Sequence, residues 1–216
     1  MPTTRMPTRS ARIHPTANVE DDVTIGPGTS VWEHVHVRGP TQIGADCIIG
    51  EKSYIAYGVR IGDRVKINAF VYIPTGVTVD DGVMISAGTI FTNDRFPRAT
   101  GPDLTALLDS GPGDHTLPTR VREGATIGAR STIGCDLEIG RFAMVGMGSV
   151  VTRAVPDFHL VLGSPARTVG CVCRCGQPIA RSTGERLPEQ PLVACGVCGL
   201  QYSIHDEQVI EIGSLA

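Results

Sequence analysis

The 216-residue sequence is poor in aromatic residues, in excess charge of one sign and in long apolar runs. Aromatic residues make up 5 %, and 19 Lys and Arg stand against 22 Asp and Glu, a formal net charge of −3. This balance leaves no electrostatic footprint for nucleic acid, so binding to a phosphate backbone is disfavoured. No apolar run approaches the roughly 20 residues of a membrane helix, and none follows the basic residues of MPTTRMPTRSAR at positions 1–12. We therefore expect a cytoplasmic protein without a secretory signal.

Glycine, proline and a six-residue repeat are what the sequence has in abundance. Its 26 Gly and 15 Pro indicate a chain rich in turns. An aliphatic residue or Phe fills every sixth position of the first half, at Ile13, Val19, Ile25, Val31, Val37, Ile43, Ile49, Ile55, Ile61, Ile67, Ile73, Val79, Ile85 and Phe91. The position four residues after each anchor up to Ile85 is small or β-branched, as at Val35, Cys47 and Ser53. The period resumes at Val121, Ile127, Ile133, Ile139, Val145 and Val151.

A period of six excludes the common secondary structures and predicts an unusual one. It scatters around a helical wheel of 3.6 residues per turn, and β-branched residues and glycine are poor helix formers. The spacing instead predicts an all-β parallel β-helix, with the anchors inside and the small residues at crowded corners. Each buried Val or Ile contributes roughly 1.5–3 kcal/mol, so the anchors together build one continuous core.

The repeat resembles that of the hexapeptide-repeat acyltransferases over residues 13 to about 168. This resemblance implies a left-handed parallel β-helix with three hexapeptides per coil, so that positions eighteen apart stack, and a homotrimer with active sites in grooves between neighbouring β-helices. We divide the chain into an N-terminal tail (1–12), the acyltransferase domain (13–168) and a Cys-rich C-terminal module (169–216). The insertion loop 94–120 breaks the register, and we expect it to line the binding surface and to contain one short helical turn.

Three segments resemble a narrower group, the nucleotide-sugar N-acetyltransferases that acetylate UDP- or dTDP-linked amino sugars, particularly 3-amino sugars. They are SVWEHVHV (30–37), RVKINAFVYIPTGV (64–77) and TIFTNDRFPRA (89–99), and the last contains the distinctive Phe91-Thr92-Asn93 and Pro97-Arg98. Members that handle UDP-linked sugar acids carry a run of amides where this chain has Asn68-Ala69-Phe70. The resemblance thus implies an acetyl-CoA-dependent N-acetyltransferase and favours a dTDP-linked amino deoxysugar.

In such a reaction a sugar amine attacks the acetyl thioester and must lose a proton. Histidine is the usual base near neutral pH. We predict His36 as the base or amine-orienting group, with His34 as the second candidate; a solvated surface position is the alternative for both. If the weakly basic sugar amine loses its proton without a protein base, Asn93 suffices as an amide that orients the nucleophile.

The substrate contacts that we predict are two cations, two aromatic residues and an amide. Lys66 and Arg98 are candidates for the diphosphate, because charge-assisted hydrogen bonds to phosphate oxygens are strong. Trp32 and Tyr57 are candidates for stacking on the base or the sugar, and Asn68 shares the column of Trp32. An ordinary solvated cation, or a structural aromatic ladder, is the alternative interpretation of each.

The segment Gly163-Ser164-Pro165-Ala166-Arg167 resembles the one that ends the solenoid in these acyltransferases. Because those enzymes hold their thioester cofactor on the last coils, the resemblance implies that coenzyme A binds there. Small residues let a thin pantetheine arm approach the backbone, and arginines can meet the phosphates. The predicted cofactor-binding residues are Gly146, Gly148, Ser149, Arg153, Ser164, Pro165 and Arg167.

The last quarter contains five of the seven cysteines. Cys195-Gly-Val-Cys198 and Cys173-Arg-Cys175 resemble the two halves of a zinc ribbon, with the residues between them forming a hairpin. We predict a structural zinc bound by Cys173, Cys175, Cys195 and Cys198, with Cys171 as the alternative to Cys173. The isolated Cys47 occupies a small inward position of its hexapeptide, so we expect it in the core.

Three other functions compete with this assignment. One is a hexapeptide acyltransferase that uses a hydroxyl group or a non-nucleotide amine, and another is a non-catalytic scaffold. The third, a hexapeptide-repeat carbonic anhydrase, requires three converging histidines. Because His34 and His36 are too close in sequence to serve on one face and no third repeat histidine accompanies them, we discount it.

Overall fold

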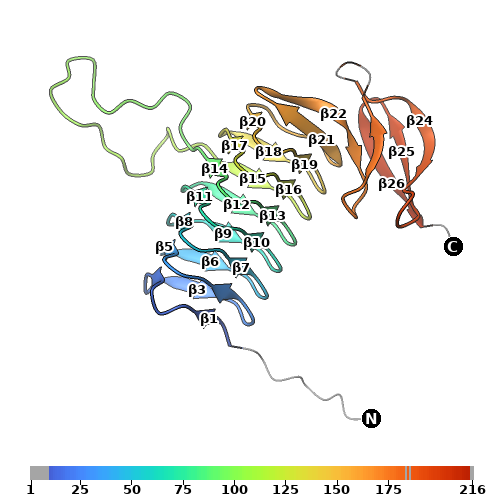
Figure 1. The fold of residues 1–216 in the computed structure, drawn as a ribbon. Coiled ribbons are helices and arrows are strands. Elements are labelled where there is room, and N and C mark those ends of the chain that lie inside the picture. Colours follow the sequence, from blue (N-terminus) through green and yellow to red (C-terminus); the bar gives the residue numbers. More distant parts are fainter. Residues whose placement is uncertain (1–9, 183, 185, 215–216) are drawn as a thin grey trace, which may run out of the picture.

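The computed structural model describes residues 10–182, 184 and 186–214, and most of them form the predicted β-solenoid (Figure 1). Short strands stack coil upon coil into three parallel sheets, a long loop projects from one side, and a small antiparallel sheet lies beyond the last coils. The described residues contain no helix long and apolar enough to cross a membrane. Residues 1–9 of the predicted tail lie outside the described residues, and Arg12 already belongs to the first strand.

The sheets are built from strands of two to seven residues. The ten-stranded sheet contains, in spatial order, β1 (Arg12–Ile13), β4 (Ser30–Val31), β7 (Ile48–Ile49), β10 (Lys66–Ile67), β13 (Met84–Ile85), β16 (Thr126–Ile127), β19 (Met144–Val145), β21 (His159–Gly163), β22 (Ala166–Val172) and β23 (Pro178–Arg181). The seven-stranded sheet contains β2 (Asn18–Val19), β5 (His36–Val37), β8 (Tyr54–Ile55), β11 (Tyr72–Ile73), β14 (Ile90–Phe91), β17 (Thr132–Ile133) and β20 (Val150–Val151). The six-stranded sheet contains β18 (Leu137–Ile139), β15 (Thr119–Val121), β12 (Val77–Val79), β9 (Arg60–Ile61), β6 (Thr41–Ile43) and β3 (Val23–Ile25). The three-stranded sheet contains β24 (Gln190–Ala194), β25 (Leu200–His205) and β26 (Gln208–Ser214).

The six-residue anchors form the core of the solenoid, as predicted. Ile49 pairs with Ile67 and Ile67 with Ile85, and all three are completely buried. The small corner positions are buried with them, including Cys47, whose Sγ lies 3.1 Å from the carbonyl oxygen of Gly62. Ile13 is 45 % exposed because its strand, β1, pairs only with β4 among the described residues.

The insertion between β14 and β15 leaves the stacking register intact. Phe91 pairs with Ile133, so the chain returns to the column after a long excursion (Figure 1). The short helical turn predicted here is wrong: the segment contains one isolated bridge, Thr100 to Leu107, and otherwise turns and irregular backbone. Leu104 and Leu107 are about four-fifths exposed, so an amphipathic helix would have no face to pack against.

β21 still pairs in parallel with β19, and antiparallel pairing begins with β22. The hairpin of β21 and β22 extends the ten-stranded sheet, and β23 pairs back onto β22. The predicted boundary at residue 168 therefore falls inside β22. The hairpin predicted between the cysteine pairs is also wrong, because β23 pairs with β22 whereas β24 pairs with β25 in the other sheet.

Candidate active site

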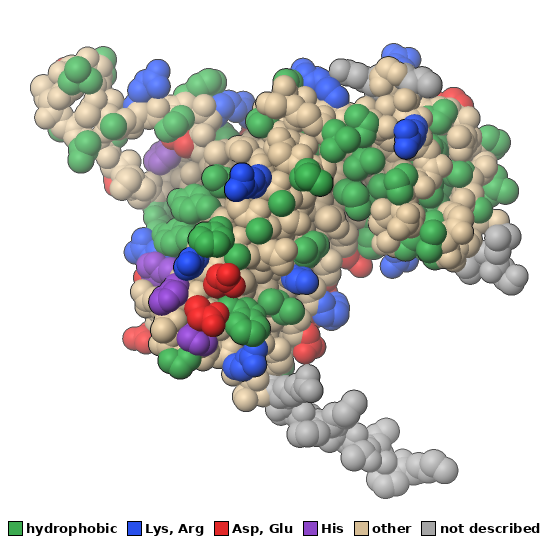
Figure 2. All heavy atoms as spheres, in the orientation of Figure 1, with side chains coloured by type: hydrophobic (Ala, Val, Ile, Leu, Met, Phe, Trp, Pro, Cys, Tyr) green, Lys and Arg blue, Asp and Glu red, His purple; other side chains and the backbone are tan. Residues whose placement is uncertain are grey.

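A column of ring side chains covers the outer face of the seven-stranded sheet and contains His36. His36 pairs with Tyr54 and Tyr54 with Tyr72, so residues eighteen apart stack as predicted. The His36 and Tyr54 rings meet edge to face with centroids 5.4 Å apart, and the Tyr54 and Tyr72 rings are stacked at 5.2 Å. Figure 2 shows histidine, acidic and hydrophobic side chains gathered over the first coils of the solenoid. The column fixes the plane and position of the His36 imidazole.

Glu20 is the acidic partner of His36. The Nε2 atom of His36 lies 3.6 Å from Glu20 Oε1; it is buried and has no hydrogen bond with any described residue. Glu20 accepts hydrogen bonds from the Gly39 N–H at 2.9 Å and from Arg38 Nε at 3.3 Å. The Gly39 bond, followed by Arg38 and His36, lowers the pKa of Glu20. An ionised carboxylate therefore faces one nitrogen of the imidazole at neutral pH.

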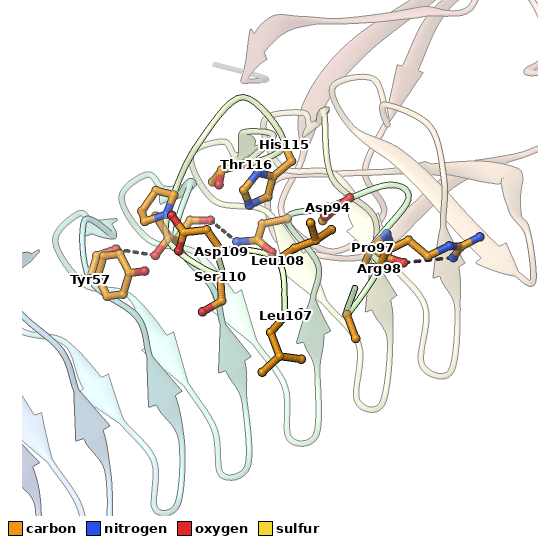
Figure 3. A pocket seen from close by; sticks show the side chains of 14 residues that line it. Tyr57, Asp94, Pro97, Arg98, Leu107, Leu108, Asp109, Ser110, His115 and Thr116 are labelled. Atoms are coloured by element: carbon orange, nitrogen blue, oxygen red, sulfur yellow. Dashed lines mark hydrogen bonds between the residues drawn. The ribbon is translucent and has the colours of Figure 1, made fainter. Parts of the chain in front are cut away.

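Beside this column, residues of the projecting insertion and the stacked Tyr57, Thr75 and Asn93 together line a cavity of about 420 Å³ (Figure 3). From the insertion, Arg98, Leu108 and His115 line the cavity. Arg38 links the cavity to the histidine column, since its guanidinium lies over the Tyr57 ring at 5.1 Å and a hydrogen bond to Tyr54 raises its pKa. Arg38 therefore contacts a residue of each feature, Tyr54 of the column and Tyr57 of the cavity.

Asn93 is held at the base of the insertion by hydrogen bonds along its column. Its Nδ2 donates to the Thr75 carbonyl at 3.2 Å, and the Thr75 hydroxyl donates to the Tyr57 carbonyl at 2.9 Å. The Leu117 N–H donates to the Asn93 carbonyl at 2.8 Å and closes the base of the loop. The second Nδ2 hydrogen and Oδ1 make no hydrogen bond to the described residues, so the amide can still orient a ligand.

The site contains groups that the sequence analysis missed. His115 lines the cavity with Asp109, and its ring points into the cavity in Figure 3. Both residues belong to the segment without periodicity, which carries no signal that places them. Glu20 could have been found, because it stands eighteen positions before the basic Arg38 and therefore stacks beside it.

Other predicted substrate residues lie elsewhere on the solenoid. Lys66 is exposed on β10 of the ten-stranded sheet. Trp32 and Asn68 follow strands of that sheet, in the turns that lead to the seven-stranded sheet, and Arg12 covers the Trp32 ring at 4.7 Å. His34 is exposed at the same corner with φ 56°. The turns that contain Trp32, His34 and Asn68 enter the seven-stranded sheet, whereas Asn93 lies where the chain leaves it.

The predicted cofactor residues lie on the last coils, where small side chains are required by packing. Ser149 is fully buried; its hydroxyl donates to the Gly146 carbonyl at 2.7 Å and accepts from the Gly163 N–H at 3.2 Å. A Cβ at Gly146 would clash with Leu162, whereas Gly148 (φ 69°) has no atom within 4 Å of its Cβ position. The backbone at Gly148 is therefore open to a ligand.

The remaining cofactor candidates surround the β21–β22 hairpin. Ser164 and Pro165 are exposed in its turn. Arg167 is half-buried on β22 and donates from Nη1 to the Ala166 carbonyl at 2.9 Å, and Arg153 is exposed just after β20. These residues place two guanidinium groups near the end of the solenoid.

Four cysteines come together at a second location. The sulfurs of Cys173, Cys175, Cys195 and Cys198 all lie within 4.8 Å of one another. Cys171 is buried inside β22 and is not part of this group. The group of four close sulfurs thus includes Cys173 and leaves out Cys171.

Comparison with known families agrees with the repeat. The model of the bacterial transferase hexapeptide (six repeats) matches residues 22–57 and 58–93. The hexapeptide repeat of succinyl-transferase matches residues 40–75 and 118–153. Together the matches cover half of the chain and lie on both sides of the insertion, so the family resemblance is confirmed.

Two curated relatives and one solved structure are similar over parts of the chain. A dTDP-3-amino-3,6-dideoxy-α-D-galactopyranose 3-N-acetyltransferase of Aneurinibacillus thermoaerophilus is 56 % identical over 57 residues, 26 % of this chain and 30 % of that protein. The bifunctional protein GlmU of a Synechococcus species is 34 % identical over 152 residues, 68 % of this chain and 27 % of that protein. The chain thus spans about a third or less of these relatives.

The similarity to a solved structure supports the fold alone. LpxA, a UDP-N-acetylglucosamine acyltransferase of Bacteroides fragilis, superposes with a TM-score of 0.60 at 14 % identity. The match covers 76 % of this chain and 62 % of that one.

Proposed function

Because the chain belongs to the hexapeptide-repeat family of bacterial transferases, we propose that it is an acetyl-CoA-dependent N-acetyltransferase. Its acceptor is the amino group of a nucleotide-linked amino sugar, a 3-amino sugar carried by dTDP. The observation that carries this proposal is the 56 % identity, over 57 residues, to a dTDP-3-amino-sugar 3-N-acetyltransferase. The geometry of the candidate site supports the roles that we propose for individual residues.

The reaction joins the sugar amine to the acetyl group. The nitrogen attacks the thioester carbonyl, the C–N bond forms, the C–S bond breaks, and coenzyme A leaves as a thiolate. The amine proton passes to His36, through the ring nitrogen that does not face Glu20, and then to the thiolate. The ionised Glu20, 3.6 Å from Nε2, stabilises the imidazolium that forms. Where the amine loses its proton directly to the thiolate, Asn93 alone orients the nucleophile.

The cavity under the insertion suits the nucleotide-sugar. Arg98 lines the cavity and supplies a cation for the diphosphate. Tyr57 is the proposed stacking partner of the base or the sugar, and Arg38 already lies over one side of its ring. Asn93, between these two residues, has an amide oxygen and one amide hydrogen left for the amino sugar.

A homotrimer accounts for the predicted residues that lie on another sheet. Lys66 belongs to the ten-stranded sheet, whereas Asn93 lies two residues after the end of β14 in the seven-stranded sheet. One convex solenoid cannot bring both side chains to one ligand. A groove between neighbouring chains would do so, with Lys66, Trp32 and Asn68 from one chain and the Asn93 cavity from the next.

The last coils are the proposed coenzyme A site. Open backbone at Gly148 suits the pantetheine arm. Arg153 and Arg167 are the proposed phosphate contacts, with Ser164 and Pro165 in the hairpin turn beside them. Ser149 and Gly146 support this site by keeping the corner narrow.

A substrate panel tests the proposal. The protein is incubated with acetyl-CoA and, separately, with dTDP-linked 3-amino and 4-amino deoxysugars, their UDP-linked counterparts, free amino sugars and amino acids. Mass spectrometry follows each acceptor. We expect the highest kcat/KM for the dTDP-linked 3-amino sugar. Folded protein that acetylates none of the nucleotide-linked amines would overturn the proposal, and turnover of a free amine or hydroxyl would support the competing acyltransferase.

A further inference from the structure

Two turns from different sheets bring the four cysteine sulfurs together. Cys173 and Cys175 lie between β22 and β23, at the end of the ten-stranded sheet; Cys195 and Cys198 lie between β24 and β25 of the three-stranded sheet. The Sγ atoms of Cys173 and Cys198 are 3.3 Å apart, and those of Cys175 and Cys195 are 3.6 Å apart. Zinc–sulfur bonds of about 2.3 Å in a tetrahedron place sulfurs roughly 3.8 Å apart. The spacing therefore matches a tetrathiolate site.

One sulfur of this group is held by a neighbouring side chain. Cys173 Sγ accepts a hydrogen bond from the Tyr202 hydroxyl at 3.1 Å, and that hydroxyl accepts from the Arg174 N–H at 3.0 Å. A hydrogen bond of this kind orients a ligand sulfur toward a metal ion.

The turns themselves fit this arrangement. Each cysteine pair is followed by a glycine in the left-handed region, Gly176 with φ 86° and Gly199 with φ 76°. The Gly176 N–H donates to the Cys173 carbonyl at 2.8 Å, and the Gly199 N–H donates to the Cys195 carbonyl at 3.0 Å. A side chain at either glycine would strain the turn that presents the sulfurs.

Besides the cysteines, the two sheets are joined by a small apolar core, by His159 Nε2 at 2.8 Å from the Glu207 carbonyl and by the ion pair of Arg174 and Glu211 at 3.2 Å. They share no strand pairing among the described residues, and the three-stranded sheet stands beside the end of the solenoid (Figure 1). The core between them contains nine buried residues, and three of these are cysteines. Around it, Phe158 packs against Tyr202 with ring centroids 5.5 Å apart. So small a core needs a further link.

We propose that Cys173, Cys175, Cys195 and Cys198 bind one Zn²⁺ that fastens the three-stranded sheet to the end of the β-helix. Four protein ligands leave no position for water or substrate, so the metal is structural. The Tyr202 hydroxyl positions Cys173, the ligand that follows β22. The site is independent of the proposed acetyl transfer.

Metal content is the first test. The full chain is purified with a phosphine reductant and without chelator, and its metals are measured by mass spectrometry. We expect one zinc per chain, released when a thiol-blocking reagent is added. Co²⁺ that replaces it is expected to give the intense visible bands of tetrahedral cobalt with sulfur ligands. Chains that contain no metal and bind neither ion, or that contain iron instead, would overturn the proposal.

Two matched variants assign the ligands. Cys198→Ser is expected to lose at least half of the bound zinc and to change the cobalt spectrum. Cys171→Ala, which removes a buried thiol outside the cluster, is expected to retain one zinc and an unchanged spectrum. Equal zinc content in both variants would contradict the assigned ligand set.

Limited proteolysis of the wild-type chain tests the role of the metal. Removal of zinc is expected to open the segment 182–190 and β24–β26 to cleavage, while β4–β20 stay protected. Re-addition of zinc should restore protection. An unchanged cleavage pattern after complete metal removal would show that the sheets are joined without the ion. Because this experiment uses the unmodified chain, a Cys198→Ser variant that fails to fold does not affect it.

Discussion

His159 is a second, metal-independent link between the solenoid and the C-terminal sheet, and its removal has a calculable cost. The buried ring bridges β21 to the turn between β25 and β26: Nδ1 lies 3.0 Å from the Thr168 hydroxyl and Nε2 2.8 Å from the Glu207 carbonyl. Since a carbonyl only accepts, Nε2 carries the hydrogen. The Thr168 bond lies within the β21–β22 hairpin, so His159→Ala costs the attachment the Glu207 bond, about 1 kcal/mol, and the packing of the buried ring, about 2 kcal/mol, about 3 kcal/mol in total.

Hydrogen exchange measured by mass spectrometry tests this cost locally. A loss of about 3 kcal/mol corresponds to roughly 10²-fold faster exchange in peptides from β24–β26. Peptides from β5–β14 serve as the internal control and are expected to exchange at the wild-type rate. Unchanged exchange in β24–β26 would refute the claim that this imidazole attaches the sheet.

The same group makes the attachment depend on pH. Burial is the main cause that lowers the pKa of His159 from its ordinary value of 6.5. When the C-terminal sheet detaches, His159 becomes exposed and binds a proton more readily. The contribution of His159 to the free energy of attachment is therefore complete above pH 6.5. It weakens as the pH falls below 6.5, by at most about 1.4 kcal/mol per pH unit. Glu189 raises the pKa of exposed His205, so protonation of His205 stabilises the folded sheet as the pH falls, opposite to the effect of His159. The pH dependence that His159 causes is therefore measured as a difference between the wild type and His159→Ala. Cleavage of β24–β26 by a protease is followed in both proteins as the pH is lowered below 6.5. Cleavage rates that change equally with pH in the two proteins would contradict the prediction.

Three further variants address the proposed active site. His36→Phe keeps a ring against Tyr54 and removes the proposed base. We expect kcat to fall about 10²-fold or more and the thermal stability to stay unchanged. Turnover at the wild-type rate would instead indicate that the departing thiolate takes the amine proton. Asn93→Ala should lower kcat/KM about 10²-fold through misplacement of the amine, and a change confined to the KM of acetyl-CoA would contradict that role. Gly146→Ala forces Leu162 to move and should raise the KM of acetyl-CoA about tenfold. The KM of the sugar substrate is the control and should not change. An unchanged KM of acetyl-CoA would indicate that the cofactor binds elsewhere.

The solenoid could be predicted from the sequence because one local rule repeats along it. A buried residue every sixth position determines the strands, and stacking every eighteenth position correctly placed His36 beneath Tyr54 and Tyr72. The same rule fails wherever the period stops. His115 and Asp109 lie in the irregular insertion, whose path depends on long-range contacts such as the Leu117 N–H bond to Asn93.

The cysteine cluster shows what spacing predicts and what it leaves open. Two closely spaced pairs indicated a metal site, but they did not distinguish Cys171 from Cys173. That choice depends on where a strand ends, because β22 ends at Val172 and only the following residue enters the turn. Nor did the spacing reveal that the pairs belong to two different sheets.

Acetyl transfer itself is tested most directly with acetyl-CoA labelled with ¹³C in the acetyl group. After incubation with the dTDP-linked 3-amino sugar, nuclear magnetic resonance identifies the bond that carries the label. We predict an amide at the 3-amino position, formed at a rate that His36→Phe and Asn93→Ala both reduce. Label that stays on coenzyme A, or that appears as an ester on a sugar hydroxyl, would contradict the account.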